Sequence, residues 1–553
     1  MAPGILYVTM QPKKSAPSAQ FHDWYNNEHG PLRLRLSFCH NGFRYHAADL
    51  DGPGKGMDEW MAIYDLSDVE DLNSQEYMKL RGPPCQTQRE RDLRPHLDIN
   101  RRTYDFISER STKGYQKIEE HVGSEQEGNV MVAVALTLKP GADRKQVDRW
   151  YDEEHIDMLS KVPGWRRTRR FQTSTVDFKE GKELELLALH EYAPQNGLGG
   201  PEFKAATTTP WNNEIMENHV AEKRRRVWDL YYTFGAAPRN LTAPADWNAP
   251  AIGTKTYPPN HVEAGPSGAI ESYVTTKDGA TLEYRLEGSK DENAPMIICV
   301  NSILVTYGIW DSFVKAFFSK PENSKYRILR YNTRGRTSTF GSEPITVDKL
   351  GDDVITLLNT FRVPKAALAI GVSLGGATVL NVGLRYSDRV ERFVSCDTNS
   401  KSPAGNSKAW TERIEMAEKD NAVASGSNEK VVGDSLAEIT TRRWFVKETY
   451  DGRAMEKEAL RVKEMVHNNS LEGFKASVKA LWEYDMEPLM KDCKSKGAFL
   501  VGAGDGVLPD GMKKMAQNLG SGTTCTVVDG AGHLPMVEKP EKVAEVVTEM
   551  LKK

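Results

Sequence analysis

The pentapeptide Gly371-Val372-Ser373-Leu374-Gly375 constrains the fold most strongly, because it joins an apolar run to a helix-like stretch. The run covers residues 366–370 and the stretch covers residues 377–382. A buried strand that turns sharply into a helix needs small residues on both sides of the turn, and Gly371 and Gly375 supply them. The pattern predicts a nucleophile elbow that exposes the Ser373 hydroxyl.

Two later strand-like segments end at polar residues that could act with Ser373, namely Asp505 and His533. The order serine, aspartate, histidine is typical of α/β-hydrolases. His533 would take the serine proton, and Asp505 would hold the imidazole in the useful tautomer. Asp397, which ends the apolar run 393–396, is an alternative acid. A turn aspartate and a packed loop histidine are the structural alternatives for Asp505 and His533.

Composition limits the class of protein. A chain of 553 residues exceeds a single hydrophobic core and predicts at least two domains. With 27% charged residues and a net charge of −4, it has no overall basic field for nucleic acid or membrane.

The six cysteines show no close pairs, which favours reduced thiols, and no segment approaches the roughly 18 apolar residues of a membrane span. The N-terminus shows no secretory leader pattern. We expect a cytoplasmic protein that binds neither nucleic acid nor membrane.

The first half of the sequence contains an internal repeat. Residues 24–29 read Trp-Tyr-Asn-Asn-Glu-His, and residues 150–155, which lie 126 positions later, read Trp-Tyr-Asp-Glu-Glu-His. The offset persists for about 50 residues and falls to 124 near the ends of the copies. Each copy reads as strand, helix, strand, strand, helix, strand. The repeat predicts two ferredoxin-like α+β units, each with one helix-covered face of its sheet.

The Trp-Tyr-(Asn/Asp)-x-Glu-His pattern resembles the dimeric α+β barrel superfamily, near its EthD-like branch. The resemblance implies that the tandem copies complete one pseudo-twofold barrel, or that this half forms a homodimer between chains. Tyr25 and His29, and likewise Tyr151 and His155, are four residues apart and are expected to share a helix face. These residues are candidates for a second site at the barrel opening, and packing or capping of the helix is the structural alternative.

Prolines divide the two halves of the chain. Six of them fall between residues 236 and 268, where they favour an extended path and oppose helix or sheet formation. We expect an α/β hydrolase fold, a mostly parallel sheet with a helical cap, fused to the two α+β repeats. The expected domains are 1–112 for the first repeat, 128–236 for the second, 237–268 for the Pro-rich linker, and 269–553 for the hydrolase domain with its cap at about 400–485.

The hydrolase half is similar to the 3-oxoadipate enol-lactonase family. The likeness lies in Asn301-Ser302-Ile303-Leu304, in the Trp-Asp pair at 310–311, in residues 330–335, which read Arg-Tyr-Asn-Thr-Arg-Gly, and in the cap segment 443–445. The resemblance implies Ser373 as nucleophile, Asp505 as acid and His533 as base. It also implies that the backbone amides of Ile303 and Leu374 form the oxyanion hole.

Two departures from that family lie near the expected pocket mouth. Leu304 replaces a glycine, and Arg336-Thr337 replaces His-Gly. Arg336 could meet a substrate carboxylate or a surface acid, and the cap tryptophans could line the pocket or pack the cap. The candidate substrate-binding residues are Asn301, Ser302, Leu304, Arg336, Trp410 and Trp444.

These patterns predict a serine hydrolase that opens a lactone or an activated ester, with a small-molecule substrate and neither metal nor organic cofactor. One alternative keeps the triad but cleaves a carbon–carbon bond in a β-diketone-type substrate. Another makes the α+β half a cyclase or binding module, with the hydrolase half as scaffold. A lactonase of this kind would fit aromatic degradation or secondary metabolism.

Overall fold

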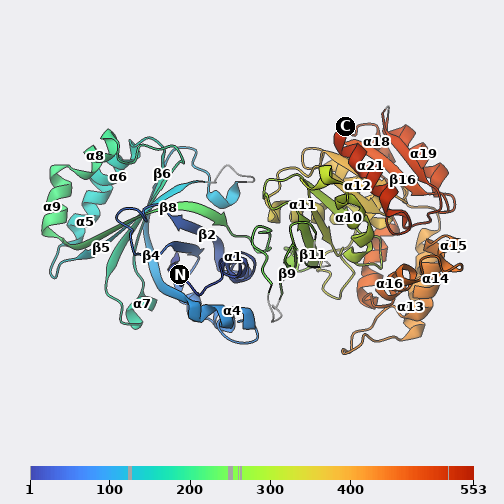
Figure 1. The fold of residues 1–553 in the computed structure, drawn as a ribbon, viewed down its shortest axis with the longest axis horizontal. Coiled ribbons are helices and arrows are strands. Elements are labelled where there is room, and N and C mark those ends of the chain that lie inside the picture. Colours follow the sequence, from blue (N-terminus) through green and yellow to red (C-terminus); the bar gives the residue numbers. More distant parts are fainter. Residues whose placement is uncertain (1, 122–127, 247–252, 260, 262–264, 521) are drawn as a thin grey trace. The chain divides into compact units, whose positions relative to one another are not determined.

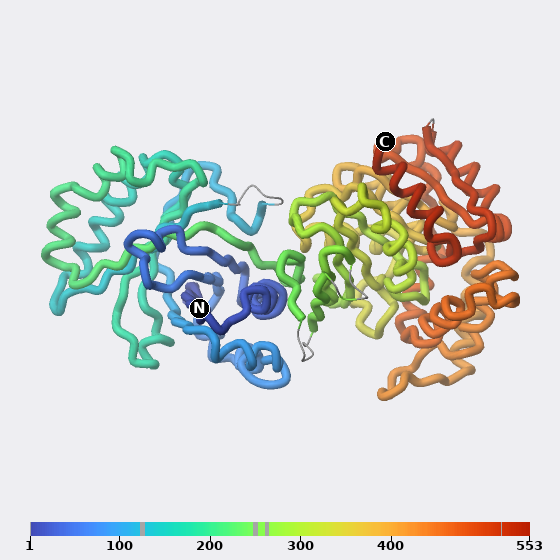
Figure 2. Tube along the Cα trace, viewed as in Figure 1, coloured from blue at the N-terminus to red at the C-terminus, as the bar shows by residue number. Residues whose placement is uncertain are grey.

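The computed structural model divides the chain into two compact units. The first comprises the chain up to Pro238, and the second comprises Arg239–Asp246 and Gly253–Lys553. Figure 2 traces them from the blue N-terminus to the red C-terminus. The structure describes residues 2–121, 128–246, 253–259, 261, 265–520 and 522–553.

The first unit is built on a closed antiparallel barrel of eight strands (Figure 1). Around the barrel the order is β1-β3-β2-β8-β5-β7-β6-β4, and β4 pairs with β1. The two sequence copies therefore contribute four strands each, and the halves meet at two seams, β2 with β8 and β4 with β6. The strands are β1 Gly4–Pro12, β2 Cys39–Ala47, β3 Trp60–Leu66, β4 Leu97–Ser111, β5 Val130–Leu138, β6 Trp165–Thr173, β7 Glu185–Tyr192 and β8 Val220–Thr233.

Helical segments follow β1 and β3 in the first copy and β5, β6 and β7 in the second. In the first copy they are α1 Ser18–Trp24, η1 Tyr25–His29, α2 Gly30–Leu34, η2 Val69–Asn73, α3 Gln75–Lys79, α4 Gln88–Leu93 and η3 Arg94–His96, followed after β4 by η4 Ile118–Glu120. In the second they are α5 Arg144–Trp150, η5 Tyr151–His155, α6 Ile156–Ser160, α7 Thr175–Lys179, α8 Pro201–Thr207 and α9 Pro210–Asn218. The first copy has the strand–helix–strand–strand–helix–strand order expected from the repeat, whereas the second copy has the short helix α7 in addition, between β6 and β7.

Alternation along the barrel strands creates three apolar cores. In β1, Leu6, Val8 and Met10 pack with the helices of the first copy, whereas Ile5 belongs to the core inside the barrel. Side chains of a strand alternate between its two faces, so one strand supplies both cores. A third core fills the space between the sheet and the helices of the second copy.

The second unit contains a nine-stranded sheet in the order β17-β16-β15-β14-β12-β13-β11-β10-β9. The strands from β12 to β17 pair in parallel, and β9, β10 and β11 form an antiparallel edge next to β13. Every residue of β12, β13 and β14 is buried, as expected when helices cover both faces of a parallel sheet. The strands are β9 Lys255–Tyr257, β10 Ala269–Thr275, β11 Thr281–Gly288, β12 Met296–Val300, β13 Arg327–Tyr331, β14 Leu368–Val372, β15 Arg392–Cys396, β16 Lys496–Gly502 and β17 Thr524–Val528.

Helices surround this sheet, and a helical cap is inserted between β15 and β16 (Figure 1). The helices around the sheet are η6 Tyr307–Trp310, α10 Asp311–Phe318, η7 Pro321–Asn323, α11 Val347–Thr360, α12 Leu374–Arg385, α19 Leu508–Leu519, α20 Pro535–Glu538 and α21 Pro540–Lys552. The inserted segment contains α13 Asn406–Asp420, α14 Asp434–Trp444, α15 Lys447–Tyr450, α16 Glu456–His467, α17 Leu471–Ser477, η8 Val478–Leu481 and α18 Glu487–Met490. In the part of the chain that the structure describes, no helix is both long enough and apolar enough to cross a membrane.

The segment expected to be a Pro-rich linker differs from the expectation. Lys255–Tyr257 forms β9 and extends the hydrolase sheet beside β10, so the prediction that prolines would exclude sheet here is wrong for these three residues. Residues 237–241 are buried, and Arg327 donates a hydrogen bond to the carbonyl of Arg239. Positions 247–252, 260 and 262–264 of the expected linker lie outside the described residues.

Candidate active site

Ser373 occupies the turn between β14 and α12, with φ 58° and ψ −119°. A non-glycine residue in such a conformation costs about 1–3 kcal/mol and requires support from its surroundings. A Cβ on Gly371 would lie 2.1 Å from the carbonyl oxygen of Gly375, and a Cβ on Gly375 would lie 2.2 Å from that of Val300. Both glycines are therefore required for the turn to form.

Backbone hydrogen bonds hold the turn in place. The Ser373 amide donates to the carbonyl of Cys396 at 2.9 Å, which ties the turn to the end of the adjacent strand β15. Leu374 is the first residue of α12, and the first amides of a helix have no acceptor within the helix. The Leu374 amide is thus placed beside the serine, as expected for one donor of an oxyanion hole.

The loop after β12 carries the other expected donor, Ile303. Leu304 adopts φ 69°, in the left-handed region that favours glycine. Leu304 therefore places a strained, buried side chain in this loop. Asn301 and Ser302 are fully buried, and Asn301 donates a hydrogen bond to the carbonyl of Val305 at 3.4 Å. These two candidates for substrate binding lie within the loop interior.

His533 and Asp505 form a hydrogen-bonded pair. His533 Nδ1 lies 2.7 Å from Asp505 Oδ2, and both side chains are mostly buried. Burial raises the pKa of Asp505, but the charge and hydrogen bond of His533 outweigh burial and hold this pKa below its usual range. Because Nδ1 faces the carboxylate, Nε2 is the imidazole nitrogen available to a serine hydroxyl.

Asp397, the alternative acid, lies next to this pair. The ligand atoms of Asp397, Asp505 and His533 all lie within 4.8 Å of one another. Asp397 is fully buried and accepts a hydrogen bond from the Gly502 amide at 2.9 Å. Burial and the charge of Asp505 raise the pKa of Asp397 well above its usual value, which favours the protonated form of Asp397 beside the carboxylate of Asp505.

Glu538 was not singled out from the sequence, yet it anchors the histidine loop. It accepts hydrogen bonds from the amides of Gly532 at 2.6 Å and Val446 at 3.1 Å. The His533 amide also donates to the carbonyl of Trp444 at 2.7 Å. The histidine loop and the end of α14 in the cap are therefore tied together. The Ala-Gly-His-Leu-Pro segment alone contains no signal for this glutamate, which is brought back by the short helix α20.

The two cap tryptophans have different surroundings. Trp444 is 1% exposed, and its ring stacks on His533 at a centroid distance of 5.7 Å. Trp410 packs edge-on against Phe474 within the cap and lies beneath the Arg413 guanidinium. Trp444 thus contacts the candidate base, whereas Trp410 packs in the cap.

Two arginines of the cap are linked electrostatically to Asp505 and to each other. Burial lowers the pKa of Arg443, opposed by the charge of Asp505, and burial together with the charge of Arg443 lowers the pKa of Arg413. Within the described ranges, neither arginine has a carboxylate within 4.0 Å. Burial lowers the pKa of Arg336 to about 10, opposed by Glu283 and Glu429.

The four second-site candidates lie in equivalent π-helical turns, η1 and η5, where an α-helix was expected. Tyr25 and His29 still meet, with ring centroids 5.0 Å apart, and Tyr151 and His155 are 5.5 Å apart. His155 Nδ1 binds the carbonyl of Ala206, so this histidine is tied to the backbone. Single π-helical turns within α-helices are frequent at functional sites.

Replacement of Asp397 by asparagine should change how stability depends on pH. An aspartate with a raised folded-state pKa stabilises the fold below about pH 3.9 and loses this contribution as the pH rises towards the folded-state pKa. Asparagine does not ionise, so the variant does not lose stability in this way as the pH rises. The unfolding free energy of Asp397→Asn relative to wild type should therefore rise as the pH increases above about 3.9, by up to about 1.4 kcal/mol per pH unit.

Chemical denaturation of the hydrolase unit at several pH values measures this difference. Asp529→Asn is the matched control, since Asp529 is exposed at the end of β17. If the difference in unfolding free energy between Asp397→Asn and wild type stays constant with pH, the pKa of Asp397 is not raised in the folded protein.

Comparisons with known proteins find matches to the second unit of the chain. Residues 297–546 match the model of the alpha/beta hydrolase family. The chain is 27% identical over 282 residues to 3-oxoadipate enol-lactonase 1 of Acinetobacter baylyi, which covers 50% of this chain and 96% of the lactonase. It is 30% identical over 118 residues to a proline iminopeptidase of Pestalotiopsis fici, covering 21% of this chain and 40% of that protein.

Among solved structures, the enol-lactonase of Burkholderia xenovorans is similar, with 23% identity and a TM-score of 0.44. The similarity covers 51% of this chain and 100% of that one. The matches to both lactonases therefore extend over about half of the present chain.

Proposed function

We propose that this enzyme, whose C-terminal half matches the alpha/beta hydrolase family, opens a lactone or an activated ester through Ser373, His533 and Asp505. The observation that carries this proposal is the strained Ser373 turn after β14, in the same unit as the paired His533 and Asp505. The enol-lactonase relative supports the choice of a lactone.

In the proposed reaction, Ser373 Oγ attacks the acyl carbon while its proton passes to His533 Nε2. The amides of Ile303 and Leu374 donate hydrogen bonds to the oxyanion, and each such donor typically lowers the activation barrier by about 3–4 kcal/mol. His533 then protonates the leaving oxygen as the carbon–oxygen bond breaks. Water attacks the acyl-serine and gives its proton to His533. His533 then returns this proton to Ser373 Oγ as the acyl–oxygen bond breaks, which releases the carboxylic acid and restores Ser373.

Active-site labelling and a product assay test this proposal together. A fluorophosphonate should add one equivalent to the full-length wild-type protein, detected by intact-mass measurement. A panel of lactones and aryl esters should then give ring-opened acids or acid plus alcohol. Products of carbon–carbon cleavage from a β-diketone, without ester or lactone hydrolysis, would contradict the proposal, as would a folded protein that takes no label.

We also propose that the preferred substrate carries a carboxylate that meets Arg443 and Arg413. The charge of Asp505 acts on Arg443 and the charge of Arg443 acts on Arg413, and neither arginine forms an ion pair within 4.0 Å among the described residues, so a substrate anion could neutralise them. Arg443→Gln should raise KM for monophenyl succinate at least tenfold, and leave KM for neutral phenyl butyrate within about twofold.

Steady-state kinetics on both esters measure this selectivity. Arg442→Gln is the control, because Arg442 lies next in sequence but pairs with Glu438 and Asp451. Equal losses on the anionic and the neutral ester would exclude a role for Arg443 in carboxylate recognition.

For the first unit, we propose that each half of the barrel is a ferredoxin-like unit related to EthD-like domains. The support is the shared order of strands, with the first strand of each half lying between the fourth and the third. The matching π-helical turns η1 and η5 support a common origin of the halves.

A further inference from the structure

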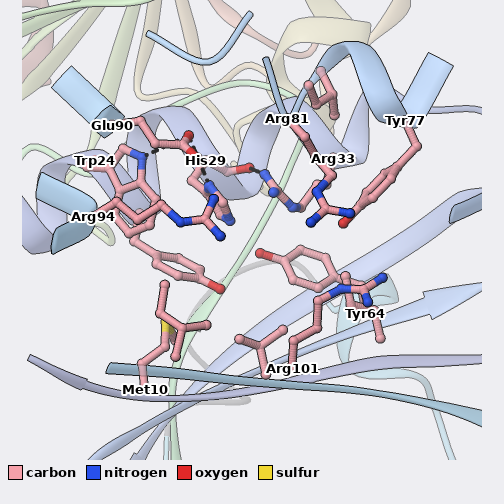
Figure 3. A pocket seen from close by; sticks show the side chains of 15 residues that line it. Met10, Trp24, His29, Arg33, Tyr64, Tyr77, Arg81, Glu90, Arg94 and Arg101 are labelled. Carbon is pink, nitrogen blue, oxygen red and sulfur yellow. Dashed lines mark hydrogen bonds and ion pairs between the residues drawn. The ribbon is translucent and has the colours of Figure 1, made fainter. Parts of the chain in front are cut away.

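A pocket in the first half of the barrel unit has no part in the proposed hydrolase reaction. It lies between the strands and the helical segments of the first copy and has a volume of about 70 Å³ (Figure 3). Its walls are largely apolar, with Leu6, Val8 and Met10 contributed by β1. Four arginines reach it from four different segments: Arg33 from α2, Arg81 from the loop after α3, Arg94 from η3 and Arg101 from β4.

Arg33 is the most unusual of these arginines, because it is buried and has no carboxylate partner. Its exposed fraction is 9%, and it donates a hydrogen bond to the carbonyl of His29 at 2.7 Å. Among the residues that the structure describes, no carboxylate lies within 4.0 Å of its guanidinium. Buried charges in proteins are normally paired, since desolvation of an isolated charge costs several kcal/mol.

The carboxylate that lines this pocket, Glu90, is already occupied. It accepts hydrogen bonds from Trp24 Nε1 and His29 Nδ1, both at 3.3 Å. Burial opposes its ionisation, but His29, Arg33 and Trp24 lower its pKa to about 2. Burial lowers the pKa of His29 to about 4, so this histidine is neutral at pH 7. The pocket therefore keeps an excess of positive charge.

The second copy shows that this charge is not needed for the fold. At the 126-residue offset, Leu159 replaces Arg33 and Thr207 replaces Arg81. Leu159 is 2% exposed and packs in the apolar core of its own half. The same arrangement of strands and helices therefore closes with a leucine where the first copy has a buried arginine.

Arg101 provides a second, independent donor. Its Nε is buried without a hydrogen-bond partner, and its nearest carboxylate in the described chain, Glu180, is 3.9 Å away. Figure 3 shows Arg101 on the side of the pocket opposite Arg33 and Arg81, with Tyr64 nearby. Donors thus face the pocket from a strand as well as from the helical segments.

We propose that this pocket binds a small organic carboxylate. Its carboxylate group accepts hydrogen bonds from Arg33 and Arg101, and its short apolar body packs on Leu6, Val8 and Met10. A cavity of about 150 Å³ accommodates a benzene ring, so a pocket of about 70 Å³ suits a chain of a few carbons. Arg81 and Arg94, which are exposed, attract the anion at the mouth.

Isothermal titration of the full-length protein with butyrate, butyramide and inorganic phosphate tests this proposal. Butyrate should bind, whereas butyramide, which has nearly the same shape without the charge, should bind at least tenfold more weakly. Phosphate should also bind more weakly than butyrate, because the apolar walls offer it nothing. Equal affinity for butyrate and butyramide, or tighter binding of phosphate, would overturn the assignment of a carboxylate.

Variants locate the binding. Arg33→Leu copies the residue of the second half and should weaken butyrate binding at least tenfold, as should the partly exposed Arg101→Gln. Arg149→Gln removes the same charge from an exposed site that pairs with Glu153, and should bind butyrate normally. Thermal melting of each variant reports folding. If the Arg33→Leu and Arg101→Gln proteins are folded and bind butyrate as tightly as wild type, this pocket is not the butyrate site. This conclusion does not depend on whether the hydrolase reaction is confirmed.

Discussion

Ser373→Ala should reduce kcat on the best lactone or ester by about 10⁵-fold or more. Loss of the nucleophile leaves only binding and oxyanion stabilisation, which in other serine hydrolases give a residual acceleration of about 10³–10⁴ over water. The variant should also lose fluorophosphonate labelling. Its stability should stay close to wild type, because the Ser373 amide keeps its hydrogen bond to Cys396.

Single-turnover and steady-state rates on the purified variant measure this effect. Ser395→Ala is the matched control, since Ser395 lies on the neighbouring strand β15 and donates its hydroxyl to the carbonyl of Gly376. The control loses a buried hydrogen bond but no reacting group, so its kcat should remain within a few-fold of wild type. A Ser373→Ala protein with substantial lactonase activity would remove Ser373 from the mechanism.

Substitutions of Asp505 and Asp397 should have very different effects on kcat. Asp505→Asn should reduce kcat by about 10⁴-fold, because an asparagine amide next to Nδ1 favours the wrong imidazole tautomer. Asp397→Asn should keep kcat within about tenfold of wild type. An asparagine oxygen can still accept from the Gly502 amide, and its NH₂ group can face Asp505 as the protonated carboxyl does.

Rates measured across the pH range on both variants distinguish the roles. If Asp397 were the working acid, the two variants would exchange their effects, with Asp397→Asn showing the larger loss. Losses of about 10⁴-fold in both would instead mean that the carboxyl pair acts as a unit.

The elbow and the order of the polar residues could be predicted because they depend on local rules. Small residues are needed wherever a buried strand turns at once into a helix. Gly371 and Gly375 meet this need, because a Cβ atom at either position would collide with a backbone carbonyl oxygen. Parallel strands end at one edge of a sheet, so the residues after β14, β16 and β17 belong to the same edge. The barrel could be anticipated for a similar reason, since the repeat doubles one pattern of strands.

Other features depend on contacts between distant residues and left no local signal. Glu538 reaches the histidine loop and the amide of Val446, which is 92 residues away in the chain. The surroundings of Arg33 come from Tyr64, Tyr77 and Glu90, which lie on separate elements. The π-helical turns and the strand β9 were also missed, because the Trp-Tyr-x-x-Glu-His segment fits an ordinary helix and the prolines near β9 suggested an extended linker.

Closure of the barrel within one chain has a consequence for how its two halves can change. In a barrel made by two identical chains, every substitution appears in both halves, so a residue that makes one pocket necessarily alters its twin. Here the seams β2–β8 and β4–β6 join halves encoded at separate positions. Arg33 and Leu159 can therefore coexist in one molecule, with one half free to specialise while the other maintains the packing of the pair.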